Sequence, residues 1–204
     1  MTEIKVEIID EIIAVAKRMD DLRLMNPFSG NISVYDDGYY YVTPTSKSKA
    51  TYTRDMICVL DSEGKQIAGS CKPSSEIKMH LGVYPMRSDI KAIIHTHSPF
   101  LTGYAICGKD FKTDSYAEAI MMGGAVLVHY GQPGTDAIYA GIGDVINDYN
   151  CFLLKNHGVL TVGENLTSAA NRAECFEAAA KVMTIAKLIG EPDPIPADEL
   201  AKLL

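Results

Sequence analysis

Four short strand-like runs lie between residues 32 and 68, and the turns that join them constrain the fold more than any other feature of the sequence. An Asp-Gly turn at residues 36–38 separates two runs of apolar and aromatic residues, a pattern that is typical of a β-hairpin. Residues 56–60 and 66–68 flank a second polar turn that contains a glycine. Because hairpins pair strands in opposite directions, these residues favour a mainly antiparallel sheet over a parallel, doubly wound one.

Hydrophobic periodicity and helix boundary residues predict the remaining elements. Apolar residues recur at three- and four-residue spacing from Ile4 to Met19, which predicts an amphipathic helix over roughly the first 24 residues, ended by Pro27. Further helices are expected at residues 75–86, 99–106, 135–147, 165–189 and within 197–204, and further strands at 90–95, 125–129, 151–155 and 158–162. No linker, repeat or low-complexity stretch divides the sequence, so we predict one α/β domain over residues 1–204 in which helices flank the sheet.

The composition excludes several classes of protein. The chain has 204 residues, of which 47% are hydrophobic, and this is enough to build a core. It has 19 basic and 26 acidic residues, a net charge of −7 and no basic cluster, so we expect no nucleic-acid partner. The apolar runs are too short to span a bilayer and the acidic N-terminus lacks a secretory pattern, so we expect no membrane partner and a cytoplasmic location.

The five cysteines are far apart and are never arranged as Cys-x-x-Cys. This odd number and wide spacing argue against a disulfide framework and against a thiolate zinc site. Cys58, Cys151 and Cys175 have apolar sequence neighbours, so we interpret them as small buried hydrophobic residues.

Three histidines suggest a metal site. His95 and His97 are two residues apart at the end of an apolar strand, and the two-residue period of a strand places both imidazoles on one face. Such a pair by itself is more often an ordinary surface or buried polar pair. His157 lies at a break between two apolar strands, where functional loops are often found. Three neutral imidazoles around a zinc ion leave an open coordination position, which suits catalysis.

Glu76 is the fourth member of this group. It follows two serines at the start of a predicted helix, shortly before the strand that carries His95. A carboxylate there could ligate a metal or act as a base, and the alternative is a purely structural charge at the positive end of the helix dipole. His80 lies on the same helical face and is a rival ligand, but its apolar neighbours favour a packed, hydrogen-bonded structural histidine.

Short hydrogen-bonding residues at loops and element starts suggest an anion site. They come from three stretches of the chain and are Asn31, Thr45, Ser46, Ser74 and Ser75. The last two precede a predicted helix, whose first backbone amides are free to bind a phosphate. Each stretch alone is more typical of a turn or a helix cap, so only their combination with the metal candidates indicates a phosphate site.

Five motifs that contain these residues resemble the class II aldolase/adducin family, in order and spacing, from about residue 6 to residue 189. They are Ser-Gly-Asn-Ile-Ser at 29–33, Thr-Pro-Thr-Ser at 43–46, Pro-Ser-Ser-Glu at 73–76, His-Thr-His-Ser at 95–98 and Asn-His-Gly at 156–158. The resemblance implies an α/β/α domain with a mainly antiparallel sheet. It also implies a homotetramer with fourfold symmetry and a zinc ion at a subunit boundary.

The resemblance further implies roles for the candidate residues. His95, His97 and His157 would be the zinc ligands, with Mn²⁺ or Co²⁺ as alternative ions, and Glu76 would be both a ligand and the catalytic base. The substrate phosphate would be held by Asn31, Thr45, Ser46, Ser74 and Ser75. Tyr116 corresponds to a tyrosine of the adjacent subunit that handles the proton on the aldehyde oxygen, and the alternative for it is a packed interface tyrosine.

The reaction that the resemblance implies is reversible cleavage of a phosphorylated ketose, such as L-fuculose 1-phosphate or a related deoxypentulose phosphate. The products would be dihydroxyacetone phosphate and a small aldehyde, formed through a metal-bound enediolate. A dehydratase of methylthioribulose phosphate and a 4-epimerase of ribulose phosphates are alternatives within the family, although the epimerases usually have Asp in place of Glu76. A non-catalytic, adducin-like interaction protein is a further alternative, which the retained ligand residues disfavour.

The sequence departs from the aldolase pattern at two places. Ser46 stands where the aldolases usually have glycine, so a left-handed backbone is more costly there. No aromatic residue follows Phe176, whereas the aldolases tend to have aromatic residues in a tail that covers a neighbouring site. The aldehyde that the chain accepts is therefore left open.

Overall fold

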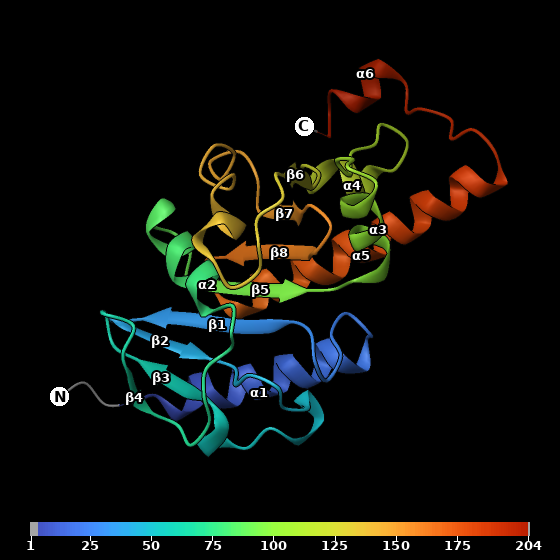
Figure 1. The fold of residues 1–204 in the computed structure, drawn as a ribbon. Helices are drawn as coiled ribbons and strands as arrows, with labels where there is room; N and C mark the ends of the chain where they lie inside the picture. The colour runs from blue at the N-terminus through green and yellow to red at the C-terminus, as the bar shows by residue number, and fades with distance from the viewer. Residues whose placement is uncertain (1–3, 204) are drawn as a thin grey trace.

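The computed structural model describes residues 4–203, which contain an eight-stranded sheet with helices on both faces (Figure 1). The strands are β1 (Asn31–Asp36), β2 (Tyr39–Val42), β3 (Cys58–Leu60), β4 (Gln66–Ala68), β5 (Ala92–Thr96), β6 (Val126–Val128), β7 (Cys151–Leu154) and β8 (Gly158–Gly163). Their order is β4-β3-β2-β1-β5-β8-β7-β6, and the neighbouring pairs are antiparallel except β6 with β7. The predicted α/β fold with a mainly antiparallel central sheet is confirmed.

The helices form a layer on each face of the sheet. They are α1 (Val6–Asp21), α2 (Ile77–Val83), α3 (Pro99–Ile106), α4 (Ala117–Met121), α5 (Leu166–Ile189) and α6 (Ala197–Leu200). On one face α1 contacts β1, α5 contacts β5 and β8, and α3 contacts β7 and β8. The other face is covered by α2 together with the segment 136–146. The sheet thus lies between two layers, as expected for an α/β/α arrangement.

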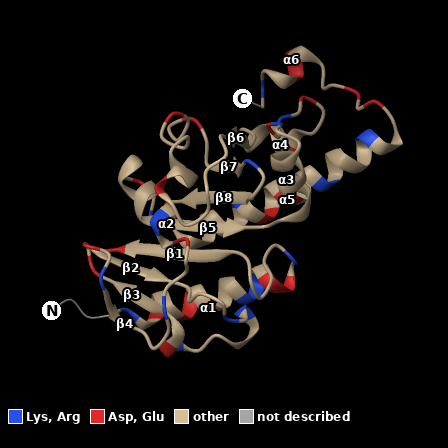
Figure 2. Ribbon diagram, viewed as in Figure 1, with Lys and Arg blue, Asp and Glu red and all other residues tan. Residues whose placement is uncertain are grey.

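Alternation of side chains along β5 assigns each residue to one of these layers. Ala92 and Ile94 belong to the core under α1 and α5, whereas Ile93 belongs to the core under α2. The same two-residue period places His95 on the α2 side of the sheet. The central strands β5, β7 and β8 have no charged residue, and Figure 2 shows acidic and basic residues interspersed on helices and loops instead.

The N-terminal helix ends earlier than its sequence pattern predicts. It stops at Asp21 because Arg23 adopts a left-handed backbone with φ of 62°. The N–H of Leu24 then bonds to the carbonyl of Met19, and the N–H of Arg23 bonds to that of Asp20, which is the Schellman pattern of a helix end. Pro27 therefore does not end this helix.

The predicted helix at residues 135–147 is wrong. Residues Asp136–Tyr139 form one 3-10 turn, and the chain continues in further turns to residue 148. Gly141 and Gly143 lower the helix propensity of this segment, and the N–H groups of its turns bond three residues back rather than four. The segment still places apolar side chains on the sheet, which is the periodicity that suggested a helix. The short helix α4 was not predicted.

The other boundaries agree with the predictions to within a few residues. Helix α2 begins at Ile77 and passes into a 3-10 turn over Tyr84–Met86, where Pro85 cannot continue the hydrogen-bonding pattern. The predicted helical turns of the C-terminal tail are α6, while residues 1–3 and 204 of the predicted terminal helices lie outside the described residues. Over residues 4–203, no helix combines the length and the apolar character needed to cross a membrane.

The interpretation of the cysteines is partly confirmed. Cys58 and Cys151 are buried, as predicted, but Cys175 is exposed. The prediction for Cys175 is wrong because the period of α5 directs its neighbour Phe176 into the core and Cys175 outward. Each of the five cysteines is a free thiol.

Candidate metal centre

The sheet brings the three histidines together from two places in the sequence. His95 is in β5 and His97 follows that strand, whereas His157 lies in the turn between β7 and β8. Strands β5 and β8 pair with Thr96 opposite Val159, so the turn before β8 lies beside the end of β5. Asn156 supplies the left-handed backbone of this turn, with φ of 56°, a conformation that asparagine tolerates better than most residues.

Gly158 permits the close approach of this turn to β5. A Cβ atom at residue 158 would lie 2.6 Å from the carbonyl oxygen of Thr96 and 3.0 Å from the ring atoms of both His95 and His97. A larger residue would therefore push the turn away from the strand. The glycine of the Asn-His-Gly motif thus has a direct steric explanation.

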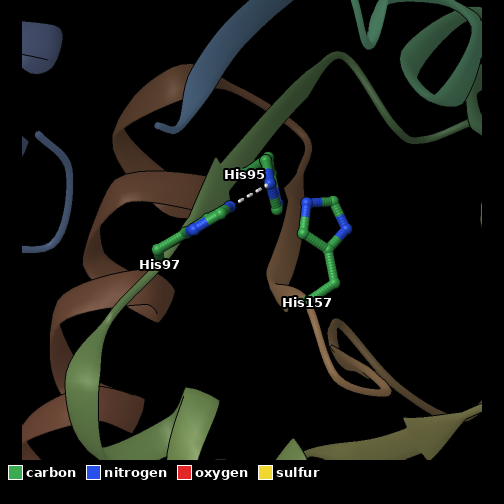
Figure 3. Close-up of side chains that lie close together, drawn as sticks. All are labelled: His95, His97 and His157. Carbon is green, nitrogen blue, oxygen red and sulfur yellow. Dashed lines mark hydrogen bonds between the residues drawn. The ribbon is translucent and has the colours of Figure 1, made fainter. Parts of the chain in front are cut away.

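The three imidazoles face one another in a tight cluster (Figure 3). The ring centroids are 4.8 to 5.0 Å apart, and the Nε2 atoms of His95 and His97 are separated by 3.1 Å. One ring nitrogen of each histidine lies within 4.8 Å of the other two. Among residues 4–203 this is the group of side chains arranged to hold a metal ion.

The hydrogen bond of His95 fixes which of its nitrogens faces the cluster with a lone pair. Nδ1 lies 2.9 Å from the carbonyl oxygen of Val159, which only accepts, so Nδ1 carries the proton. Burial lowers the pKa of His95 to about 3, against the opposing effect of Glu76, so the ring is neutral and Nε2 presents a lone pair. Burial and the charge of His157 also lower the pKa of His97. Neutral imidazoles oriented by a backbone carbonyl are the form that binds metals.

Glu76 completes the cluster from the start of α2. Its Oε2 atom is 3.3 Å from Nε2 of His95, and its Oε1 atom is 3.2 Å from Nε2 of His157. Burial by itself would raise the pKa of Glu76, but the close ring of His157 and the charges of His95 and His157 hold that pKa well below its usual range. The group is therefore a carboxylate near neutral pH.

These residues fit a divalent cation. Oε1 of Glu76 is buried and, within the described part of the chain, has no well-directed hydrogen bond, and the ring nitrogen beside it is Nε2 of His157 at 3.2 Å. Buried polar atoms without a partner are costly, and a cation would satisfy the carboxylate oxygen and the converging ring nitrogens together. Three imidazoles and one carboxylate are a ligand set typical of zinc and of similar divalent ions.

Two loops with the predicted phosphate-binding residues lie beside Glu76. Pro44 and Pro73 form an isolated β-bridge, and the N–H of Thr45 donates to the carbonyl of Lys72 at 3.0 Å. Ser46 adopts φ of 53°, so the left-handed conformation is kept although the residue is not glycine. The structure thus brings together residues 43–46 and 72–75.

The hydroxyl groups of these loops differ in their surroundings. Ser74 is buried, and its Oγ accepts the N–H of Glu76 at 3.2 Å, which fixes the turn that leads into α2. Ser46 and Ser75 are exposed and Thr45 is half-buried. Solvent-facing hydroxyls next to a helix start are suited to an anion.

The side chains of Asn31 and Tyr116 have hydrogen-bond partners other than these loop hydroxyls. The side-chain amide of Asn31 has both ends engaged, with Nδ2 donating to Glu76 at 2.8 Å and Oδ1 next to His80, so it is held beside the carboxylate. Tyr116 stands at the start of α4, packs against the core under α3 and donates its hydroxyl to Glu118. The structure therefore does not bring Tyr116 to the histidine cluster of its own chain.

Sequence reasoning missed one buried residue near the centre. Lys49 is 4% exposed, and its ammonium group donates to the carbonyls of Asn26 and Ser29 at 2.7 and 2.8 Å. These bonds hold the loop that leads into Asn31. A single lysine in a polar stretch carries no sequence signal for such burial, because its partners are backbone atoms far away along the chain.

The fold is a sheet between two helical layers. Three histidines and a carboxylate converge at the end of its central strand, which is typical of a metal site on an α/β fold. Residues 10–184 match the family model for the class II aldolase and adducin N-terminal domain. The chain belongs to the class II aldolase and adducin family.

Characterised relatives with similar sequences carry out more than one reaction. An L-fuculose phosphate aldolase of Methanococcus maripaludis is 31% identical over 172 residues, which cover 84% of this chain and 93% of the relative. A 5-deoxy-D-ribulose 1-phosphate aldolase of Bacillus thuringiensis is 32% identical over 196 residues, covering 95% and 92%. A 3-oxo-tetronate 4-phosphate decarboxylase of Haemophilus influenzae is 34% identical over 161 residues, covering 76% of each.

The fold is also similar to that of a solved L-fuculose 1-phosphate aldolase. The two structures superpose with a TM-score of 0.89 at 30% sequence identity, over 98% of this chain and 95% of the other. By their names, the relatives described above act on phosphorylated sugars or sugar acids.

Proposed function

We propose that this protein is a metal-dependent aldolase that reversibly cleaves a phosphorylated ketose to dihydroxyacetone phosphate and a small aldehyde. The substrate class is L-fuculose 1-phosphate or a related deoxypentulose 1-phosphate. The observation that carries the proposal is the carboxylate of Glu76, which lies 3.2 and 3.3 Å from the imidazole nitrogens of His157 and His95 and directly follows the loop that ends in Ser74 and Ser75.

The metal would be held by His95, His97, His157 and Glu76. Zinc is the ion we propose, with Mn²⁺ and Co²⁺ as alternatives that the same nitrogen and oxygen donors accept. When bound, the cation would supply Lewis acidity that stabilises the negative charge of an enediolate. An imidazole ligand carries no negative charge, so of the four proposed ligands only the carboxylate of Glu76 would offset the charge of such an ion.

Glu76 is the proposed base that moves the proton at C3 of the ketose. Its carboxylate is ionised, so once the substrate displaces it from the metal it would be able to accept a proton. The phosphate would be bound by the loops with Thr45, Ser46, Ser74 and Ser75. Asn31 is the fifth residue of that proposed set, and its engagement with Glu76 supports a place between the phosphate and the base.

Tyr116 is proposed to serve the site of a neighbouring subunit in a homotetramer. Its position on α4, away from the histidines of its own chain, agrees with a function across an interface. Its hydroxyl, which donates to Glu118, would give a proton to the aldehyde oxygen as the C3–C4 bond forms in the condensation direction, and would take that proton back from the C4 hydroxyl as the bond breaks in cleavage.

The test is proton NMR of dihydroxyacetone phosphate in D₂O with the zinc-loaded protein and a chelator-treated control. Loss of one C3 proton signal that depends on the metal is the expected result, because it reports enediolate formation without knowledge of the aldehyde. If the zinc-bound protein produces no exchange, the aldolase proposal is wrong.

A dehydratase of methylthioribulose phosphate is the second candidate, and the retained carboxylate at Glu76 favours it over an epimerase. The two reactions differ in their products. A dehydratase consumes its ketose phosphate without releasing dihydroxyacetone phosphate, so an enzymatic assay for that product separates the candidates.

A further inference from the structure

A continuous chain of buried hydrogen bonds leads from Glu76 into the core between β1 and α2. Nδ2 of Asn31 donates to Oε2 of Glu76 at 2.8 Å, and Oδ1 of Asn31 lies 2.5 Å from Nε2 of His80. Nδ1 of His80 lies 2.7 Å from the hydroxyl of Ser33, which lies 2.7 Å from the hydroxyl of Tyr84. We call Asn31, Ser33, His80 and Tyr84 the β1–α2 chain.

The geometry of the two elements produces this arrangement. Glu76, His80 and Tyr84 are four residues apart along α2 and its ends, so they share one helical face at intervals of about 6 Å. Asn31 and Ser33 are two residues apart and share one face of β1, at an interval of about 6.6 Å. Because the two intervals are nearly equal, each strand residue bridges two helix residues, and the side chains alternate along the contact.

The hydrogen bonds of the β1–α2 chain have a single direction. A carboxylate only accepts, so Asn31 presents its NH₂ group to Glu76 and its carbonyl oxygen to His80, whose Nε2 then donates. Burial lowers the pKa of His80 to about 4, so its ring is neutral near pH 7 and Nδ1 accepts the proton of Ser33. Tyr84 in turn donates to Ser33. Every donor in the chain therefore points toward the carboxylate.

Packing alone does not account for these residues. Ser33 and His80 are fully buried, and an apolar residue at either position would avoid the cost of burying a polar group. An apolar replacement would, however, remove the hydrogen bonds that fix the orientation of the Asn31 amide. Linked hydrogen bonds also polarise one another, which strengthens the last donor in the series.

We propose that the β1–α2 chain is a positioning device for the carboxylate of Glu76: it fixes Oε2 through Asn31 and thereby keeps Oε1 directed at His157, ready to meet the cation and the substrate proton. Ser33, His80 and Tyr84 are positioning residues that do not touch the substrate. This inference rests on the proposed function for its catalytic part, whereas its metal-binding part can be measured without any substrate.

The experiment uses the full chain with three substitutions and one matched control. His80→Leu removes the donor to Asn31, His80→Gln keeps an N–H donor at a similar reach, and Tyr84→Phe removes only the distal hydroxyl. Tyr41→Phe is the control, because Tyr41 is equally buried and its hydroxyl accepts the N–H of Lys5, outside the β1–α2 chain. Thermal unfolding of each variant verifies that it folds.

The first readout is the affinity for Co²⁺, titrated into chelator-stripped protein and followed by visible absorption. We expect His80→Leu to bind Co²⁺ at least about 10-fold more weakly than the unsubstituted protein, the usual effect of losing a partner behind a metal ligand. His80→Gln is expected to recover most of the affinity, and Tyr41→Phe to leave it unchanged. Equal affinities in His80→Leu and the unsubstituted protein would overturn the proposal.

The second readout is the C3 exchange of dihydroxyacetone phosphate, with kcat and KM measured separately. We expect kcat to fall about 10-fold in His80→Leu and less in Tyr84→Phe, at unchanged KM, because the phosphate loops are intact. An increase of KM at unchanged kcat contradicts a positioning function.

If His80→Leu does not fold, the comparison of Tyr84→Phe with Tyr41→Phe decides. If no protein catalyses exchange, the proposed function fails, and the Co²⁺ affinities still decide on the β1–α2 chain.

Discussion

At the scale of single residues, the proposed function makes two demands on the carboxylate of Glu76, namely contact with the imidazoles and readiness to accept a proton. Replacement by glutamine keeps the shape and removes the basic oxygen. We expect Glu76→Gln to retain bound zinc, measured by atomic absorption, and to slow C3 exchange by about 10²- to 10⁴-fold, the usual contribution of a general base. Unchanged exchange in a zinc-bound Glu76→Gln protein would exclude Glu76 as the base.

Ser46 offers a test of backbone strain in the loop beside the centre. It adopts φ of 53° without being glycine, a conformation that costs an ordinary residue roughly 1 kcal/mol. A glycine would remove this strain, but it also loses more conformational entropy on folding than serine does, which offsets part of the gain. We therefore expect Ser46→Gly to stabilise the protein by about 0.5 kcal/mol, measured by urea unfolding. Ser48→Gly is the control, because φ at Ser48 is −69° and a glycine there brings no relief.

Because Lys49 is buried, the stability of the protein is expected to change with pH in the alkaline range. Burial lowers the pKa of Lys49 to about 8, against the opposing charge of Asp20, whereas an unfolded chain keeps lysine protonated up to about 10.5. Between these values the unfolded state binds more protons, so this group makes the protein more stable as the pH rises. We expect the free energy of unfolding, relative to Lys49→Met, to increase between pH 8 and 10.5 by about 3 kcal/mol. A constant difference across that range would contradict the low pKa.

At the scale of secondary-structure elements, α3 depends on a carboxylate from α5. The two oxygens of Glu177 accept the N–H groups of Phe100 and Leu101, each at 2.9 Å, at the helix start just after His97. Glu177→Gln leaves one of these buried donors without a partner, so we expect a loss of about 2 kcal/mol in thermal or urea unfolding. Glu174→Gln, one turn earlier on α5, breaks only the surface pair with Arg18 and is expected to cost less than about 1 kcal/mol.

The elements also show how far the sequence predicts this fold. Turn residues between apolar runs predict the two hairpins, and boundary residues predict α5, because these signals are local. The helix predicted at residues 135–147 is wrong for a different reason. The apolar residues of this segment recur because they pack on the sheet, whereas its two glycines favour turns over an α-helix. The β1–α2 chain could not be predicted, because the pairing of Ser33 with His80 depends on how a helix docks on a strand.

At the scale of the whole molecule, the prediction is an assembly of four chains whose sites are shared between neighbours. We expect sedimentation equilibrium to give the mass of a tetramer. We expect Tyr116→Phe to remain tetrameric, to retain C3 exchange of dihydroxyacetone phosphate, and to lose about 10²-fold in aldehyde-forming cleavage, since only the step that makes or breaks the C3–C4 bond uses its proton. A monomeric protein with full cleavage activity would contradict both the assembly and the function of Tyr116.

The site illustrates which functional residues a sequence can reveal. The spacing of His95 and His97 on one strand predicts a shared face, and the structure does bring His157 to them. Nothing local in the sequence joins His157 to that pair, so its position at a break between two strands and the family motif were the two indications for it. Burial of Lys49 and the engagement of Asn31 with Glu76 depend on tertiary contacts and were not foreseen. The single-domain organisation and the cytoplasmic location stay predictions.

The sheet order has a kinetic consequence. Strand β5 pairs with β8 in the middle of the sheet, and the candidate metal centre draws its groups from the start of α2, from the end of β5 and from the turn before β8, which are far apart in the sequence. Such a centre exists only after these elements have packed together, so a cation cannot bind tightly to a partly folded chain. Interactions that are absent from the transition state slow unfolding and leave the folding rate nearly unchanged. Occupancy of the centre would therefore govern how long the native protein lasts, and not how fast it forms.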